Sequence, residues 1–341
     1  MKNIFYDFNK VLSYNALLNI IIGERGVGKT YGSKVYVIKR YLKYHKKFVY
    51  IRRYESDLEA SVGNNTQEKF FEQVKKEFPD CMFKITKHKK VRSLWINNEI
   101  CGYAVPLSAS DSLKSSTYED VDTLIYDEFQ LKEGSSQHYL RNEPEIILDL
   151  IETIGRLRDI RIFLLGNAIS STSPIMTYFN LTLPYNSEVK TFKDGLILVN
   201  YIKNEAYREV KKESRFGKLI SDTRYGEYAI DNKFLTDSKA FIKKKSVGCR
   251  FSFIFILDGK EYGVWINYTE QLMFISNDID PNCPIRFAIN NDDHNENSVL
   301  IKIRLNPYFK MVLDYYKMAR LNFENQQIKN IFSQNVLRYS Y

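Results

Sequence analysis

The sequence of 341 residues predicts an α/β protein built around a phosphate-binding loop. Three observations lead to this fold class. A glycine-rich loop lies between a buried strand and a helix, a later apolar strand ends in two acidic residues, and short apolar runs alternate with amphipathic segments. The length favours about two domains, and the 44% of hydrophobic residues is enough for sizeable cores.

The glycine-rich loop fits the pattern G-x-x-x-x-G-K-[ST]. The apolar run 17–22 leads into it, and the helical segment 30–46 follows, which is the context that this motif requires. We expect Lys29 to reach the β- and γ-phosphates of ATP and Thr30 to bind Mg²⁺. The alternative is a glycine-rich turn that contains Lys-Thr by chance. The predicted nucleotide-binding residues are Gly23, Glu24, Arg25, Gly26, Val27, Gly28, Lys29, Thr30 and Asp127.

A later apolar strand, within residues 122–129, has Asp127-Glu128 at its end, which is the Walker B pattern. Asp127 is expected to hold Mg²⁺ through its water shell, and Glu128 to orient and activate the attacking water. Asp-Glu after an apolar strand is common by chance, but here it follows a complete phosphate loop by roughly a hundred residues. The adjacent glutamate indicates the additional-strand ATPases (ASCE ATPases), such as helicases, recombinases and packaging motors, rather than Ras-like switches.

Six residues are candidates for an active site that is shared between subunits. Asn167 ends another buried strand, 162–167, and suits a sensor of the γ-phosphate or of the lytic water. Arg156 and Arg158 precede that strand, where an arginine finger would serve a neighbour's site, although a surface ion-pair cluster is the alternative. Lys114 is either a cation that acts across an interface or a solvated lysine, and the residues alone favour the second. Glu24 and Arg25, at the crest of the loop, are expected to face an adjoining protomer.

Basic residues suggest a polyanionic partner, in keeping with a net charge of +9. Arg52 and Arg53 end the strand 48–54 and could contact nucleotide, another subunit or nucleic acid. An ion pair with Glu55, Asp57 or Glu59 is an equal alternative. The hairpin tip 87–92 is expected to contact a polyanion or to be a solvated turn.

The predicted domains are an ATPase domain at 1–197, a helical linker at 198–240 and a C-terminal domain at 241–341. The C-terminal domain should contain a meander of three strands at 251–257, 262–266 and 272–276. A helix at 307–323 and another that ends near residue 337 should follow the strands.

Several classes of protein are disfavoured. The four cysteines never approach C-x-x-C spacing, so a zinc site is not expected and a reducing cytosol fits better than a disulfide framework. The first residues lack the apolar core of a signal peptide. No apolar run approaches ~18 residues, so no membrane segment is expected.

The chain resembles the DNA-encapsidation ATPases of small, protein-primed tailed phages, which are podovirus packaging motors. The resemblance runs almost end to end and includes motifs that are not general to ATPases. Its residues are Leu12-Ser13-Tyr14, 23–29, 50–54, 104–108, 126–129, 215–220, Tyr225-Gly226-Glu227, Gly263-Val264-Trp265 and Asn295-Glu296-Asn297.

The resemblance implies a homopentameric ring that uses ATP to drive double-stranded DNA through the portal into a prohead. It also implies a C-terminal RNase H-like α/β domain that is a degenerate nuclease. Arg156 matches the family's arginine finger, and Lys114 matches a lysine proposed to act across the interface. The protein would work in the host cytoplasm, transiently at the portal vertex, and be absent from the mature virion. Docking through a structural packaging RNA or directly on the portal stays open.

No nuclease activity is expected, because such a site needs several carboxylates around two metal ions. Asp258 lies in a predicted Asp-Gly turn and Asp292-Asp293 in a polar loop. A ring helicase or recombinase that acts on single strands is the alternative function, but the 87–92 hairpin lacks stacking aromatics. An idle binding module is disfavoured because Lys29, Thr30, Asp127 and Glu128 are all intact.

Overall fold

The computed structural model divides the chain into two compact units, Met1–Thr236 and Asp237–Tyr341, which we describe separately. It describes residues 5–113, 118–131, 137–168, 173–179, 181–184, 187–223, 225–226, 230 and 241–336. In these ranges, no helix is both long and apolar enough to cross a membrane.

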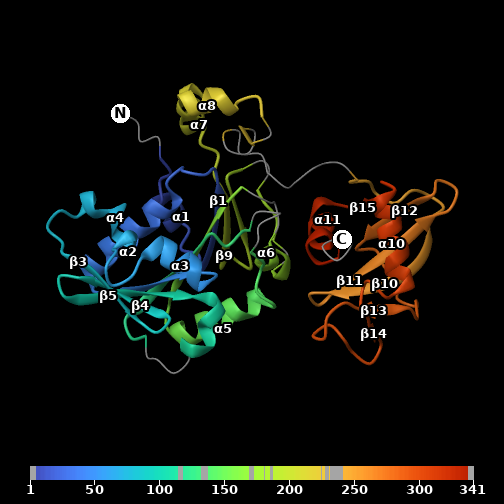
Figure 1. Cartoon of the computed structure of the whole chain (residues 1–341), viewed down its shortest axis with the longest axis horizontal. Coiled ribbons are helices and arrows are strands. Elements are labelled where there is room, and N and C mark those ends of the chain that lie inside the picture. The colour runs from blue at the N-terminus through green and yellow to red at the C-terminus, as the bar shows by residue number, and fades with distance from the viewer. Residues whose placement is uncertain are drawn as a thin grey trace. The chain divides into compact units, whose positions relative to one another are not determined.

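The first unit contains a nine-stranded sheet whose six central strands are parallel (Figure 1). A β-hairpin continues it antiparallel at one edge, and a single antiparallel strand closes the other. In spatial order the strands are β3 (Phe83–His88), β4 (Val91–Ile96), β5 (Glu99–Pro106), β2 (Lys47–Arg52), β6 (Val121–Asp127), β7 (Arg161–Asn167), β1 (Leu18–Gly23), β9 (Ile197–Tyr201) and β8 (Val189–Phe192). One strand, β7, therefore separates β1 from β6, in agreement with the predicted additional-strand arrangement.

Amphipathic helices cover both faces of this sheet. Alternate residues of β1 point to opposite sides, so Ile21 joins one core and Ile20 and Ile22 join the other. The first core is closed by α1 (Asn9–Leu12), α2 (Lys29–Tyr44), α3 (Glu55–Val62) and α4 (Lys69–Glu72). The second is closed by α5 (Glu143–Gly155) and α6 (Pro174–Tyr178). The 3₁₀ helices are η1 (Lys75–Glu77) and η2 (Leu107–Leu113).

This topology brings polar residues together at one edge of the sheet. Because β1, β2, β6 and β7 are parallel, their carboxyl ends meet at the same edge. The phosphate loop continues from the end of β1, and the last residues of β2, β6 and β7 are Arg52, Asp127 and Asn167.

One expectation about the first unit was wrong. The boundary expected at 197/198 cuts through β9, which pairs with β1 and so belongs to the sheet. The expected helical pieces do follow, as α7 (Glu205–Glu213) and α8 (Arg215–Ile220), but they belong to the first compact unit.

The second unit is a six-stranded sheet packed against helices. The meander of β10 (Arg250–Leu257), β11 (Lys260–Asn267) and β12 (Leu272–Ser276) confirms the prediction, and Asp258 and Gly259 form its first turn at positive φ. Next to β10 lie β13 (Arg286–Ala288) and then β14 (Val299–Leu300), and β15 (Leu321–Phe323) pairs with β12. Two helices, α10 (Pro307–Lys317) and α11 (Gln326–Asn335), complete the core. The helix expected over 307–323 therefore ends at Lys317, and its last predicted residues form β15.

Candidate nucleotide-binding site

The phosphate loop joins β1 directly to α2, so the strand, loop and helix predicted from the sequence are confirmed. Gly26 and Gly28 have φ values of +87° and +102°, a conformation that residues with a Cβ rarely adopt. These two glycines let the loop turn tightly into α2, which begins at Lys29. The N-terminus of α2 therefore presents backbone N–H groups and the positive end of the helix dipole to an anion.

Lys29 is buried inside the loop. Its Nζ donates to the carbonyl oxygens of Gly23 at 3.0 Å and Glu24 at 2.8 Å, and to Asn167 Oδ1 at 3.2 Å. Burial lowers the pKa of Lys29 to about 8, although the negative charges of Asp127 and Glu24 oppose this shift. Phosphate oxygens could replace these acceptors, since they are the stronger partners for a lysine.

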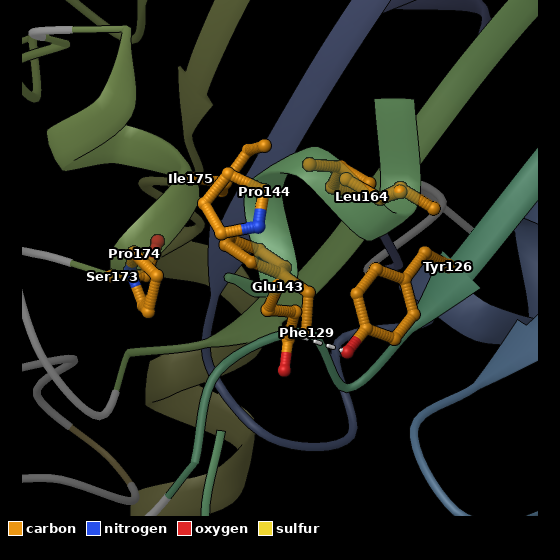
Figure 2. Close-up of a pocket in the computed structure, with 9 residues that line it drawn as sticks. Tyr126, Phe129, Glu143, Pro144, Leu164, Ser173, Pro174 and Ile175 are labelled. Atoms are coloured by element: carbon orange, nitrogen blue, oxygen red, sulfur yellow. Dashed lines mark hydrogen bonds between the residues drawn. The ribbon is translucent and has the colours of Figure 1, made fainter. Parts of the chain in front are cut away.

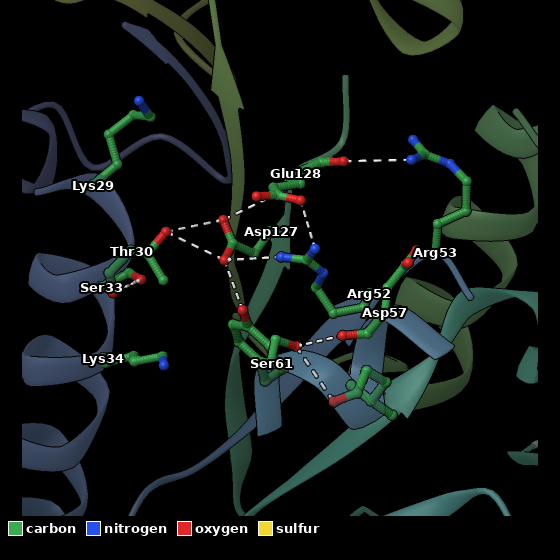
Figure 3. A network of polar contacts seen from close by, with 12 residues as sticks. Lys29, Thr30, Ser33, Lys34, Arg52, Arg53, Asp57, Ser61, Asp127 and Glu128 are labelled. Carbon is green, nitrogen blue, oxygen red and sulfur yellow. Dashed lines mark hydrogen bonds and ion pairs between the residues drawn. The ribbon is translucent and has the colours of Figure 1, made fainter. Parts of the chain in front are cut away.

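Thr30 and Asp127 form the pair predicted for the metal (Figure 3). Thr30 Oγ1 lies 3.1 and 3.2 Å from the two carboxylate oxygens of Asp127, and the Tyr50 hydroxyl donates to Asp127 Oδ2 at 2.6 Å. A hydroxyl and a carboxylate at this spacing fit Mg²⁺, which typically takes one or two protein oxygens and completes its shell with water and phosphate.

Arg52 forms an ion pair with Glu128, a contact that the sequence did not predict. Its Nη2 donates to Glu128 Oε2 at 2.5 Å and its Nη1 lies 3.5 Å from Asp127 Oδ2 (Figure 3). Burial alone would lower the pKa of Arg52, but Tyr50, Asp127 and Glu128 raise it above its ordinary value. The guanidinium therefore remains charged and balances both acids. Of the two alternatives left open for Arg52, the ion pair with Glu55, Asp57 or Glu59 is wrong.

Arg53, in contrast to Arg52, makes structural contacts around the site. It donates to Glu143 at 2.7 and 2.9 Å and to the carbonyl of Phe129 at 2.6 Å. Tyr126 also donates to Glu143, at 2.8 Å (Figure 2). Arg53 and Glu143 are almost fully buried, so this pair fixes the segment after Asp127 against the start of α5.

The pocket in Figure 2 does not hold a nucleotide. It lies between the Tyr126–Phe129 segment, the start of α5 and the start of α6, and its volume is about 10 Å³. That is room for roughly one water molecule. Its lining does not include the phosphate loop.

The other predicted residues are placed as follows. Asn167 joins the site through Lys29. Arg156 is exposed at the end of α5, before β7, and lies at the opposite end of that strand from Asn167. The Arg158 guanidinium donates to three backbone carbonyls, those of Tyr118, Ile154 and Gly155. Lys114 lies outside the described residues.

The structure overturns one expectation about charged residues and limits another to part of its segment. Glu24 does not face outward, because its side chain is fully buried and pairs with Arg208 of the same chain; Arg25 is exposed. In the 87–92 hairpin, Arg92 is fully buried, and both Lys87 and Arg92 pair with Glu55 and Glu59. Only the tip, residues 88–90, is exposed.

A parallel sheet that carries this loop, with a Thr–Asp pair beside a buried lysine, defines the class of phosphate-loop α/β proteins. Within that class, a family model described as Podovirus DNA encapsidation protein (Gp16) matches residues 1–339. The chain belongs to this family, which confirms the resemblance.

Individual relatives agree with this assignment. The chain is 37% identical to the DNA packaging protein of Bacillus phage phi29 over 332 residues, 97% of this chain and 96% of the relative. It is 34% identical, with a TM-score of 0.76, to a chain of the bacteriophage Phi-29 viral genome packaging motor assembly, and the match covers 99% of this chain and all of that one. The crystal structure of the N-terminal domain of the phi29 DNA packaging ATPase matches 59% of this chain and 98% of its own, with 35% identity and a TM-score of 0.51.

Proposed function

We propose that this protein is an ATP-driven translocase of double-stranded DNA that packages a viral genome into a preformed prohead through the portal. The observation that carries the proposal is the grouping of Lys29, Thr30, Asp127 and Glu128 at one edge of the sheet. Family membership along nearly the whole chain supplies the purpose of the ATP.

The proposed chemistry divides among the residues of this edge. When bound, Mg²⁺ neutralises charge on the phosphate oxygens of ATP. Thr30 and Asp127 would hold the metal, Lys29 would bind the β- and γ-phosphates, and Glu128 would orient and activate the attacking water. Asn167, already bonded to Lys29, would sense the γ-phosphate.

Arg52 imposes an order on this chemistry. In the described conformation Glu128 Oε2 is bonded to its guanidinium, so this oxygen can take a proton from water only after the contact opens or shifts. We therefore interpret the structure as a resting arrangement in which the catalytic base is held by a neighbouring cation.

We propose a homo-oligomeric ring, a pentamer by resemblance, whose sites are shared between subunits. Arg156 is the better candidate for the arginine finger than Arg158, because the carbonyls around Arg158 already occupy its guanidinium. Lys114 is proposed to act across the same interface.

The second unit is proposed to be an RNase H-like domain that binds DNA without cutting it. Its strand order places β13 parallel beside the first strand of an antiparallel meander. Asp293 accepts from the backbone N–H groups of Asp258 and Gly259 at 2.9 and 2.7 Å, so this carboxylate stabilises the turn between β10 and β11. Lys244 and Arg250 are exposed candidates for phosphate contacts.

The proposed setting follows from the family. The partners would be duplex DNA, the portal of the prohead and, in one mode of docking, a structural packaging RNA. The place of action would be the host cytoplasm, transiently at the portal vertex, with no membrane and no presence in the mature virion. Within the first unit, α7 and α8 would form a small helical subdomain that leads to the second unit.

Hydrolysis of Mg²⁺-ATP by the purified protein tests this proposal against the helicase alternative. Duplex DNA should stimulate turnover regardless of its sequence, and the stimulation should weaken steeply with salt because the contacts are to phosphates. Preferential stimulation by single strands, together with strand separation, would support the helicase instead.

A further inference from the structure

Helix α7 (Glu205–Glu213) lies against the crest of the phosphate loop, although about 180 residues separate them in the sequence. Three hydrogen bonds join them. Arg208 Nε donates to Glu24 Oε1 at 2.6 Å, Lys211 Nζ donates to the Arg25 carbonyl at 3.0 Å, and the Tyr207 hydroxyl donates to the same carbonyl at 3.3 Å.

The Glu24–Arg208 pair is the buried part of this contact. The Glu24 side chain has no exposed area and that of Arg208 is 23% exposed. Among the described residues, Glu24 Oε2 has no hydrogen-bond partner, so the carboxylate depends on Arg208. Loss of the partner would leave a buried charge uncompensated, which is the costly way to break such a pair.

The approach of α7 to the loop is also close. A Cβ built on Gly26 would lie 2.6 Å from the Tyr207 hydroxyl oxygen, so a side chain at this position would push the end of the Tyr207 side chain aside. Asn204 fixes the start of α7, since its side chain accepts from the Tyr207 N–H. The helix therefore rests on the loop backbone at a defined position.

Glu24 connects this contact to the interior of the loop. Its carboxylate accepts a hydrogen bond from Arg208, and its backbone carbonyl accepts one from Lys29 inside the loop. A phosphate that draws Lys29 away would remove the inner bond, while the bonds from α7 to Glu24 and Arg25 would remain. The position of the crest, and with it that of α7, should then differ between the empty and the occupied loop.

We propose that Arg208 is a positioning residue that couples occupancy of the phosphate loop to the docking of α7. This inference rests on the proposed function, because it requires the loop to bind nucleotide. Helix α7 would then respond to nucleotide although it does not contact phosphate, and Glu24 would transmit the change in the loop to the helix.

Hydrogen exchange of the full chain, with and without Mg²⁺ and a non-hydrolysable ATP analogue, tests the coupling. In the wild type, the analogue should change exchange in residues 205–213 as well as at the start of α2. In Arg208→Ala at saturating analogue, the start of α2 should still respond and α7 should not. The response of α7 in the wild type separates coupling from a purely structural role for Arg208, because a helix that is merely docked would not respond to the analogue.

Affinity gives a second readout. Arg208→Ala should weaken binding of a fluorescent ATP analogue by roughly 5- to 150-fold, the range of coupled sites. Arg208→Lys, which retains the charge, should recover part of the loss and keeps the test available if the alanine variant does not fold. Glu209→Ala, an exposed change on the same helix, is the matched control and should bind like the wild type.

The outcomes separate the two proposals. If the wild type and Lys29→Ala bind the analogue equally, or neither binds it, nucleotide binding at this loop is wrong and the inference falls with it. If the wild type binds, Lys29→Ala does not, and α7 exchange is unchanged by the analogue, only the inference is overturned. An α7 response that persists in Arg208→Ala would also overturn it.

Discussion

At the scale of single residues, Lys29 is the side chain that we expect to meet an anion in the loop. Burial makes its charge unfavourable, and the loop's own carbonyls offset part of that loss. Phosphate would supply a full negative charge to the same Nζ, so binding should restore the ordinary preference of the lysine for its charged form.

This competition predicts a pH dependence. The pKa of Lys29 falls from 10.5 to about 8 on folding, so the unfolded chain holds more protons between these values, and this group's contribution to folding stability rises with pH across that window. In the folded empty protein Lys29 loses its charge as pH rises through about 8. Nucleotide affinity should therefore fall above that pH, and calorimetry in buffers of different ionisation enthalpy should show proton uptake on binding.

Lys34 provides the control for this experiment. It is buried one turn further along α2, and burial lowers its pKa to about 8 as well, but its Nζ donates to the Phe70 carbonyl and to Gln73. Lys34→Met should keep the pH profile of nucleotide binding, whereas Lys29→Met should abolish binding. Loss of the profile in the Lys34 variant would contradict the assignment.

Glu128 is the residue on which hydrolysis should depend. Glu128→Gln keeps the size of the side chain and removes its basicity, so turnover should fall by roughly 10²- to 10⁴-fold while nucleotide still binds. Steady-state hydrolysis and analogue binding measure the two effects separately. Glu119→Gln, an exposed change at the other end of β6, is the control, and equal turnover in both variants would remove Glu128 as the base.

At the scale of elements, the Arg53–Glu143 pair joins β2, the segment after β6 and α5. The pair is bidentate and buried, and Tyr126 and the Leu140 N–H complete the bonding of Glu143. These contacts hold the backbone that follows Asp127, so the geometry of the site depends on residues that touch no nucleotide.

Arg53→Ala should therefore destabilise the first unit by roughly 3–5 kcal/mol, because it leaves a buried carboxylate without its partner. Denaturant unfolding followed by circular dichroism measures this loss. Lys75→Ala breaks the partly exposed Lys75–Glu68 pair and should cost less than about 1 kcal/mol. Similar losses in the two variants would show that burial does not set the importance of the Arg53 pair.

The elements also show what the sequence can predict. Lys29, Thr30 and Asp127 could be found because local spacing and strand context define their motifs. The partners of Arg52 could not be predicted. Three acids follow Arg52 closely in the chain, whereas its actual partners lie beside it because β2 and β6 are neighbours in the sheet. Strand β9 was missed because the buried Asn200 interrupts its apolar run; Tyr6 donates to its side chain, an interaction between distant segments.

At the scale of the whole molecule, the position of Arg156 predicts a site completed by another subunit. It lies at the opposite end of β7 from Asn167, so it cannot serve its own loop without a large rearrangement. Arg156→Ala and Glu128→Gln should each be inactive alone. Mixed rings should regain hydrolysis, because an intact loop of the first variant can meet the intact arginine of the second.

The control for mixing is Glu128→Gln combined with a Glu128→Gln, Arg156→Ala double variant. No interface in such a ring contains both intact residues, so activity should not return. Recovery in this control, or its absence at every ratio of the two single variants, would argue against a site shared through Arg156.

The central claim is that ATP hydrolysis here moves duplex DNA into a prohead. The most direct measurement is protection of linear double-stranded DNA from added nuclease, with this protein, purified empty proheads, Mg²⁺ and ATP. Genome-length DNA should become protected with ATP and the wild-type protein, and should stay sensitive with a non-hydrolysable analogue or with Glu128→Gln. Hydrolysis of ATP without any protected DNA, with active proheads and every required docking component present, would contradict the account.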